Sequence, residues 1–171
     1  MKKEHIRSIC QISLIVAIMC VFAQLSFYVG PIPMTMQTLV VAFSGYLLGL
    51  KKSSVAILVY IMLGAVGAPV FSAFNGGFHI LIGYTGGFIW GFIPYAILCA
   101  IAPKKKIGIV LGLVGMLVCH MIGTVQYALL SETNIFVAFV VASVPFLLKD
   151  VIFTIIAYFL ASKVRKTIKL S

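Results

Sequence analysis

The sequence predicts an all-α integral membrane protein with six transmembrane helices and both termini in the cytoplasm. Of its 171 residues, 63% are hydrophobic and 9% are charged, whereas a soluble domain has about 25% charged residues. Six apolar runs are long enough, or nearly so, to span a hydrocarbon core about 30 Å thick. The basic residues stand in small clusters between alternate runs, which is the arrangement that membrane topology requires.

The six runs together predict one membrane domain over residues 1–171. Their approximate spans are 9–28, 31–50, 53–71, 83–102, 107–130 and 135–162. The second run begins with Pro31 and Pro33, and the third has Gly64, Gly67 and Pro69 near its end. Both should therefore contain helices shorter than a full span. Irregular backbone at membrane depth persists only where protein or a cavity covers it, so we expect these interruptions to line a cavity.

The distribution of basic residues predicts the orientation. Twelve of the thirteen Lys and Arg residues precede the first run or follow the second, fourth and sixth runs, and the thirteenth is Lys149. The connections 29–37, 72–82 and 131–134 contain none and should face the outside. Topology thus explains the net charge of +10 without a nucleic-acid partner. The first run, about 20 residues long, exceeds a signal-peptide core, which favours an uncleaved first helix.

Lys149 and Asp150 stand next to each other near the middle of the sixth run. A charge at the bilayer centre costs about 2.5–3.5 kcal/mol even on the insertion scales, so such residues usually face the protein interior and have a function. Mutual neutralisation between packed helices is the alternative. This alternative explains the pair less well, because apolar residues of similar volume would usually stabilise the packing at least as much as a buried ion pair does. We therefore expect a functional site here.

The connection between the third and fourth runs combines glycines with aromatic and polar side chains. Glycine lets the backbone approach a ligand closely, aromatic rings provide apolar walls, and a few polar groups give direction, which is the composition of a small-molecule pocket. A tight hairpin with glycine-mediated helix packing is the alternative. The candidate residues are Phe74, Asn75, Gly76, Gly77, His79, Tyr84, Thr85 and Phe88.

The connection between the first and second runs is the second candidate for a pocket lining. Pro31 and Pro33 force an extended backbone, and Thr35, Gln37 and Thr38 follow with donors and acceptors on the outer side. A helix cap would explain the two threonines, but it does not readily explain Gln37.

Polar or small residues inside two other runs leave their roles open. His120, Gln126 and Tyr127 in the fifth run either line a cavity or bond to a neighbouring helix. Ser13 and Ala17 in the first run form a small-x-x-x-small pair, which allows another helix to approach closely.

The sequence lacks the residue groupings of an enzyme or a metal site. Glu4, Glu132 and Asp150 are the acidic residues, so there are no paired carboxylates, and no nucleophile–base–acid set or phosphate-binding loop is recognisable. The four cysteines lie within apolar runs and lack the spacing of metal ligands. We expect a protein that is not an enzyme, needs no cofactor, and takes the energy for any pumping from a partner.

Four segments follow recognisable short patterns. Residues 31–38, 63–71, 83–92 and 145–150 are similar, in this order, to P-V-P-x-T-x-Q-T, L-G-x-x-G-x-P-V-F, G-P-T-G-G-Y-L-x-G-F and P-F-x-P-G-D. Together they resemble the BioY family, the biotin-specific S components of energy-coupling factor (ECF) transporters. Three departures are present. Tyr84 replaces a proline, Leu148 and Lys149 replace Pro-Gly, and Phe153 stands where the family often has lysine.

The resemblance implies an S-component bundle of six helices in the prokaryotic cell membrane that binds biotin from outside. It also implies a transmembrane coupling protein (T component) as a partner and two cytosolic ATPases that alone use ATP. We expect the small pair Ser13 and Ala17 to form the contact with the coupling protein. An S component for another vitamin, such as a flavin or thiamine, is the first alternative, and a small membrane enzyme or a scaffold protein is the second.

The same resemblance suggests roles for the candidate residues. Asp150 and Asn75 suit the ureido group of biotin, and Phe74, Tyr84 and Phe88 could wall its ring. Lys149 is the first choice for the carboxylate, with the N–H groups of Gly76 and Gly77 as the fallback. The remaining candidate contacts are Thr35, Gln37 and Thr85.

Overall fold

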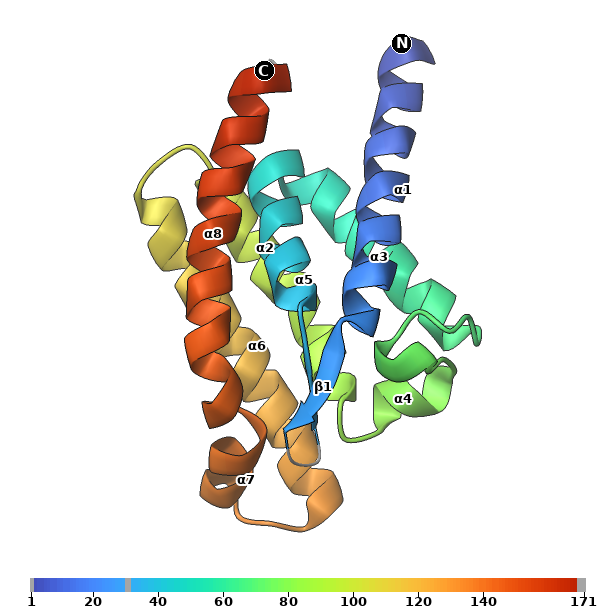
Figure 1. The fold of residues 1–171 in the computed structure, drawn as a ribbon, viewed down its shortest axis with the longest axis vertical. Coiled ribbons are helices and arrows are strands. Elements are labelled where there is room, and N and C mark those ends of the chain that lie inside the picture. Colours follow the sequence, from blue (N-terminus) through green and yellow to red (C-terminus); the bar gives the residue numbers. More distant parts are fainter. Residues whose placement is uncertain (1, 30–31, 169–171) are drawn as a thin grey trace.

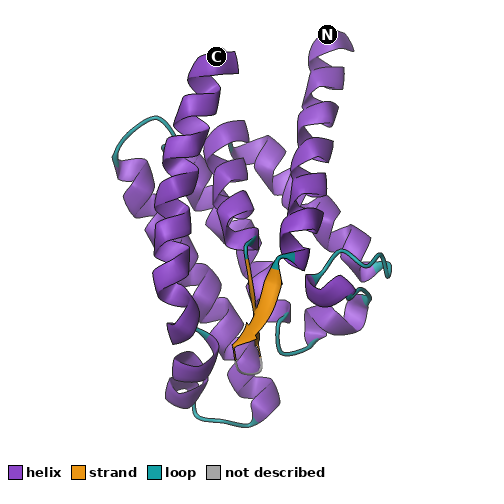
Figure 2. Cartoon of the chain, in the orientation of Figure 1, coloured by secondary structure: helices purple, strands orange, loops and turns teal. Residues whose placement is uncertain are grey.

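The computed structural model describes residues 2–29 and 32–168, so Pro31 and Lys169 lie outside the described residues. This part of the chain contains eight α-helices, a short 3-10 helix and a β-hairpin, arranged as a helical bundle with both termini at one end (Figures 1 and 2). The elements are α1 (Lys2–Gln24), β1 (Ser26–Val29), β2 (Ile32–Thr35), α2 (Gln37–Leu48), α3 (Leu50–Ala65), η1 (Ser72–Phe74), α4 (Phe78–Ile82), α5 (Gly86–Ile101), α6 (Ile107–Ser131), α7 (Ile135–Ala142) and α8 (Val144–Ile168).

Three of the described helices are long and apolar enough to cross a membrane. They are α1, α6 and α8, with mean hydropathies of 2.1, 2.1 and 1.9 over their most apolar windows. The helices α2 and α5 are apolar but shorter. The predicted helical membrane bundle is therefore confirmed as a fold class, although the helices differ in length.

The first two runs differ from continuous helices because a hairpin separates them. Helix α1 already ends at Gln24, and the chain then forms β1 and β2, which pair antiparallel with Phe27 opposite Met34. Pro33 fits this strand because a proline ring fixes φ in the extended range and removes a backbone donor. As a result α2 begins only at Gln37.

The sixth run, treated as one span in the sequence, contains two helices. Helix α7 ends at Ala142, and Ser143 adopts φ −126° and ψ −47° before α8 begins at Val144. Pro145 stands in the first turn of α8, where the missing backbone N–H costs nothing. The break places Lys149 and Asp150 near the start of α8 rather than in the middle of one long helix.

Helices α5 and α6 pack closely through glycines. A Cβ at Gly91 would lie 2.8 Å from the Cα of Cys119, and one at Gly87 would lie 2.6 Å from the carbonyl oxygen of Ile122. Such contacts require glycine, because real Cβ atoms do not approach other heavy atoms this closely. The contact fixes the rotation of α6 and turns His120 toward the interior, where it is buried.

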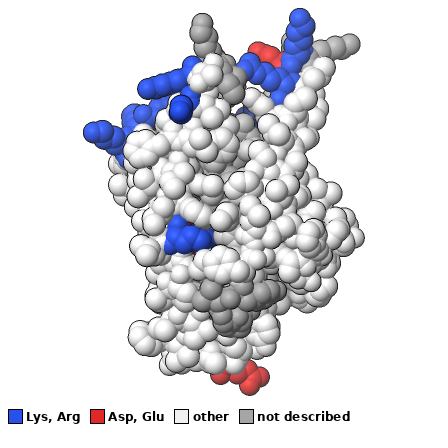
Figure 3. Space-filling model, viewed as in Figure 1, with Lys and Arg blue, Asp and Glu red and all other residues white. Residues whose placement is uncertain are grey.

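Most of the basic side chains gather at the end of the molecule where both termini lie, and one separate basic patch lies near the middle of the face shown (Figure 3). The hairpin, α4 and α7 form the opposite end (Figure 1). This separation agrees with the bias of Lys and Arg in the sequence.

Candidate ligand-binding site

A mainly apolar cavity of about 70 Å³ lies next to the hairpin, between β2, α2, α5, α6 and the start of α8. Aromatic and aliphatic side chains form most of its wall, and a few polar groups are concentrated around Asp150. The lining residues are Ile32, Pro33, Met34, Thr35, Gln37, Thr38, Phe71, Ser72, Ile80, Thr85, Phe88, Ile89, Phe92, Cys119, His120, Phe146, Lys149 and Asp150.

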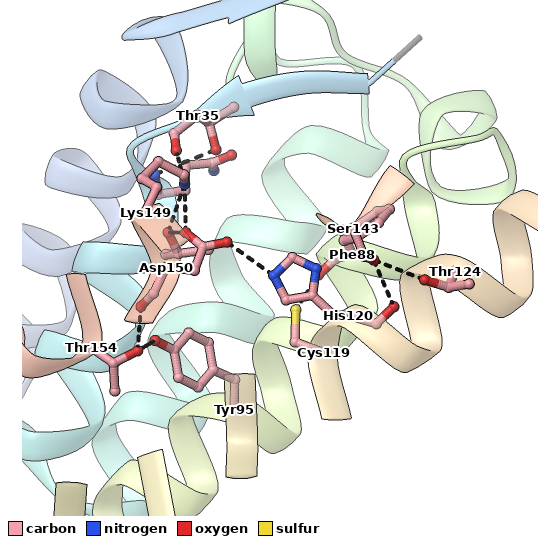
Figure 4. A network of polar contacts seen from close by, with 12 residues as sticks. Thr35, Phe88, Tyr95, Cys119, His120, Thr124, Ser143, Lys149, Asp150 and Thr154 are labelled. Atoms are coloured by element: carbon pink, nitrogen blue, oxygen red, sulfur yellow. Dashed lines mark hydrogen bonds and ion pairs between the residues drawn. The ribbon is translucent and has the colours of Figure 1, made fainter. Parts of the chain in front are cut away.

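Asp150 is the centre of the polar part of this cavity, and only 2% of it is exposed. Its Oδ1 accepts a hydrogen bond of 2.5 Å from the hydroxyl of Thr38 and lies 2.5 Å from the ammonium of Lys149. Its Oδ2 lies 3.0 Å from Nε2 of His120 (Figure 4). Three helices thus supply the partners of one carboxylate: α2, α6 and α8 itself. Such pairing is what a buried charge requires.

Lys149 curls back toward its neighbour. Adjacent helical residues point about 100° apart, but the long side chain brings Nζ to Asp150, to the carbonyl oxygen of Thr35 at 2.7 Å and to the hydroxyl of Thr38 at 3.2 Å. It also lies 4.9 Å from the ring centroid of Phe153, within the range of a cation–π contact. The three N–H donors of the ammonium therefore have three oxygen partners.

A second layer of hydrogen bonds holds these groups in place. The hydroxyl of Thr154 donates to the backbone carbonyl of Asp150 at 2.6 Å and lies 2.6 Å from the hydroxyl of Tyr95 (Figure 4). On the other side of the cavity, Nε2 of Gln37 donates to the hydroxyl of Tyr60 at 2.6 Å. Tyr60 in turn donates to the carbonyl of Val70 at 3.0 Å.

His120 has one ring nitrogen in use and one without a partner. Nδ1 is buried and makes no hydrogen bond to any residue in the described part of the chain. The ring of Phe88 packs edge-on against the imidazole, with centroids 5.8 Å apart. A buried polar atom without a partner costs free energy, so this nitrogen is the one incompletely satisfied group of the polar cluster.

The structure brings six of the candidate contacts together at the cavity. They are Thr35, Gln37, Thr85, Phe88, Lys149 and Asp150. The cap interpretation of Thr35 also has some support, since its hydroxyl accepts from the backbone N–H of Gln37 at 3.4 Å.

The other five candidates, all from the glycine-rich connection, do not line the cavity. Phe74 is 71% exposed and Tyr84 is 50% exposed. The amide of Asn75 donates to the carbonyl of Ser72 at 2.8 Å. Gly76 packs against the backbone of residues 67–68, and the N–H of Gly77 donates to the carbonyl of Gly64 at 2.7 Å. These contacts are those of the alternative for this part of the segment, a tight hairpin with glycine-mediated packing, and the role of the five residues in binding stays a prediction.

The three polar residues of the fifth run have different positions. His120 lines the cavity. Gln126 bonds to neighbouring backbone, because its Nε2 donates to the carbonyls of Leu81 and Gly83 at 3.0 and 2.7 Å. The ring of Tyr127 packs against that of Tyr84, with centroids 5.6 Å apart.

The cavity is also lined by Thr38, which belongs to the second candidate segment but was not assigned a contact with biotin, and by Phe92 and Phe146, which the sequence did not single out. No sequence signal distinguishes these two aromatic residues, since an aromatic residue in an apolar run is equally compatible with membrane or core.

Comparison with known proteins decides the family. The BioY family matches residues 1–170 of the sequence. The chain belongs to the BioY family. The predicted family resemblance is therefore confirmed. BioY proteins are transporter subunits rather than enzymes, which agrees with the prediction from the missing catalytic groups.

Individual BioY relatives extend over nearly the whole chain. A "Probable biotin transporter BioY" of Pyrococcus horikoshii is 35% identical over 159 residues, which cover 93% of this chain and 96% of the relative. A "Biotin transporter BioY" of Thermotoga maritima is 32% identical over 164 residues, with coverages of 94% and 96%.

The crystal structure of an S-component for biotin from an ECF-type ABC transporter has the same fold. Its TM-score is 0.90 at 18% sequence identity, covering 97% of this chain and 94% of that chain. The expected S-component bundle is thus confirmed at the level of the fold.

Proposed function

We propose that this chain is the biotin-binding membrane subunit of an ECF-type vitamin transporter in a prokaryotic cell membrane. Family membership and the names of the relatives support this function. The single observation that carries it in the structure is the ionisable cluster of Asp150, Lys149 and His120 at the edge of an apolar cavity. A cluster of this kind inside a membrane bundle is expected to serve a ligand.

The chemistry of the cavity suits biotin. The ureido ring has two N–H donors, for which the Asp150 carboxylate is a charged acceptor, and charged hydrogen bonds are the stronger ones. The rings of Phe88 and Phe92 give an apolar wall for the sulfur-containing ring. Lys149 is the cation that lines the cavity, and we assign the biotin carboxylate to it.

The size of the cavity adds a condition to this proposal. Its volume of about 70 Å³ is well below the roughly 300–1,000 Å³ of ordinary small-molecule sites. Binding therefore requires the walls to separate. A ligand N–H can then bond to Oδ2 of Asp150, which has His120 as its one partner, whereas Oδ1 already has two close partners.

Binding of tritiated biotin to the purified protein tests the function. Asp150→Asn should weaken binding by roughly 10- to 150-fold, because a hydrogen bond to a charged group contributes about 1.5–3 kcal/mol. Unlabelled riboflavin and thiamine serve as competitors, and displacement of biotin by either would favour the alternative vitamins.

A double variant, Lys149→Leu with Asp150→Asn, distinguishes ligand binding from helix packing. It removes both charges, so the bundle keeps no unpaired ion. Full biotin affinity in this variant would assign the pair to packing and would contradict our proposal for the site.

Six membrane spans with both termini in the cytoplasm remain part of the proposal. The separation of basic residues from the hairpin end supports it (Figure 3). After removal of the native cysteines, Lys105→Cys and Lys166→Cys should be protected from an impermeant thiol reagent in intact cells, whereas Glu132→Cys should react. Outside labelling at position 105 would contradict this topology.

A coupling protein and two ATPases are the proposed partners, with the exposed face of α1 as the contact. Ser13 and Ala17 are both exposed, so another helix can reach them. Because helix association in a membrane depends on close packing, Ala17→Trp should abolish co-purification with the coupling protein and biotin uptake while leaving biotin binding unchanged. Normal uptake would exclude this face from the contact.

A further inference from the structure

A second cavity, of about 230 Å³, lies among elements at the end of the molecule where the termini are found. Segments distant in the sequence form it: α1, the α2–α3 junction, the α5–α6 connection and the end of α8. It shares no lining residue with the cavity at Asp150, so the proposed biotin site does not account for it.

Three basic side chains line this second cavity: Lys52, Lys104 and Arg165. Among the residues that the structure describes, no acidic one lines it. Within residues 2–29 and 32–168, both ion pairs involve Asp150, so none of the three cations is paired with a carboxylate. A concave site with three positive charges and no negative one has a positive potential that attracts anions.

Two of these cations differ from the ordinary basic residues at this end. Lys52 and Arg165 are half-buried, whereas Lys51, Lys105 and Lys163 are exposed. Basic residues that only fix the membrane topology have no reason to be half-buried, because their charge acts in the aqueous layer. The half-buried pair therefore requires a separate explanation.

Hydrogen bonds hold the two half-buried cations in position without using all of their donors. Nη1 of Arg165 donates to the carbonyl of Pro103 at 3.2 Å. Nζ of Lys52 donates to Oε1 of Gln11 at 2.9 Å. A guanidinium has five N–H donors and an ammonium has three, so several remain for a ligand with many acceptor oxygens.

We propose that this cavity binds one phosphate group, the chemistry shared by anionic phospholipid heads and soluble phosphate esters. Phosphate fits because its oxygens accept from guanidinium and ammonium groups. Two further features favour a lipid as its source. Leu47 and Leu48 add an apolar wall beside the cations, and basic pockets between membrane helices on the cytoplasmic side are known binding sites for anionic head groups.

Native mass spectrometry of the full-length protein in a neutral detergent tests this proposal. The protein is titrated with phosphatidylglycerol or, as the uncharged-head comparison, phosphatidylcholine. We expect one tightly held phosphatidylglycerol per protein and no equivalent phosphatidylcholine. Near an anionic surface, one Lys or Arg contributes about fivefold in affinity. The triple variant Lys52→Gln, Lys104→Gln, Arg165→Gln should therefore bind phosphatidylglycerol about 100-fold more weakly.

A matched control removes the same charge from exposed positions at the same end. The control triple variant is Lys51→Gln, Lys105→Gln, Lys163→Gln, and its affinity should change less than about twofold, because these side chains do not line the cavity and salt screens charges that lie away from the ligand. Equal losses in both triple variants, or no loss in the cavity variant, would overturn the proposal.

A single variant separates loss of binding from loss of folding. Lys104 is exposed, and its side chain makes no hydrogen bond to a described residue, so Lys104→Gln should fold normally. It should nevertheless weaken phosphatidylglycerol binding about fivefold, and unchanged binding would contradict our assignment.

Competition with soluble glycerol phosphate identifies the source of the bound phosphate group. Its displacement of the lipid would assign the site to soluble esters, and its failure to do so would assign the site to the membrane.

Discussion

Two groups of charged side chains in this molecule follow opposite rules. Asp150 and His120 lie buried and Lys149 half-buried beside the apolar cavity, and the two charges of opposite sign touch each other. Lys52, Lys104 and Arg165 at the other end all carry the same sign and contact no carboxylate among the described residues. Charged side chains therefore have partners of opposite charge beside the apolar cavity, whereas those at the other end are stable without one among the described residues.

Solvent explains this difference. A charge in a low-dielectric interior must be paired or it destabilises the fold strongly, whereas water and salt screen a charge at the surface. The buried group should accordingly respond to single substitutions much more than the surface group does. The following substitutions run from the largest expected effect to the smallest; the first two test the buried group, and the last tests exposed side chains outside the cavity.

The largest effect is expected for Lys149→Met. It leaves the Asp150 carboxylate buried beside an apolar side chain, and breaking a buried pair in this way costs about 3–5 kcal/mol. Unfolding in detergent micelles, followed by circular dichroism during a denaturant titration, measures the loss. The double variant Lys149→Met, Asp150→Asn should recover most of it. A single variant as stable as the unsubstituted protein would show that the pair is effectively solvated.

An intermediate effect is expected for His120→Leu. The substitution removes the partner of Oδ2 of Asp150 but leaves Thr38 and Lys149 on Oδ1, so the free energy of unfolding should fall by about 1–3 kcal/mol. The matched control is His79→Leu. Because His79 is exposed, its substitution should change stability by less than about 0.5 kcal/mol. Equal effects of the two variants would argue against the importance of the His120–Asp150 contact.

The smallest effect is expected in the glycine-rich connection. Phe74→Ala and Asn75→Ala alter exposed side chains outside the cavity, so biotin affinity should change by less than about threefold, within the range of ordinary surface substitutions. Equilibrium binding of tritiated biotin measures it. A tenfold loss in either variant would show that this connection folds onto the ligand, as the sequence suggested.

The sequence was most informative where apolar runs were uninterrupted. The fourth and fifth runs, 83–102 and 107–130, lie close to the observed helices Gly86–Ile101 and Ile107–Ser131. At Pro33 composition predicted that the backbone would change but not what it would form, and the break in the sixth run was not predicted. A hairpin and a break at Ser143 depend on which neighbours supply hydrogen bonds and packing.

The same limit applies to the candidate site. Asp150 and Lys149 were predictable because the cost of burying a charge is independent of the fold. The predicted role of Asn75 stays a prediction; in the structure its amide bonds to its own turn, at the carbonyl of Ser72, because a polar side chain near glycines can do so. The role of His120 stayed open because it depends on the rotation of α6, which the contact between Gly91 and Cys119 fixes.

The glycine contact between α5 and α6 also makes this wall of the cavity stiffer than the opposite wall. Two backbones that touch with no side chain between them have no rotamers to rearrange, so this wall should not move in small steps. The opposite wall, β2 and the start of α8, is joined partly through the flexible side chain of Lys149. Amide exchange should therefore be faster in residues 32–35 than in the middle of α5 and α6. Biotin would therefore contact one rigid wall, formed by α5 and α6, and one more mobile wall, formed by β2 and the start of α8. The mobile wall would determine the path of biotin inward and its residence time in the cavity.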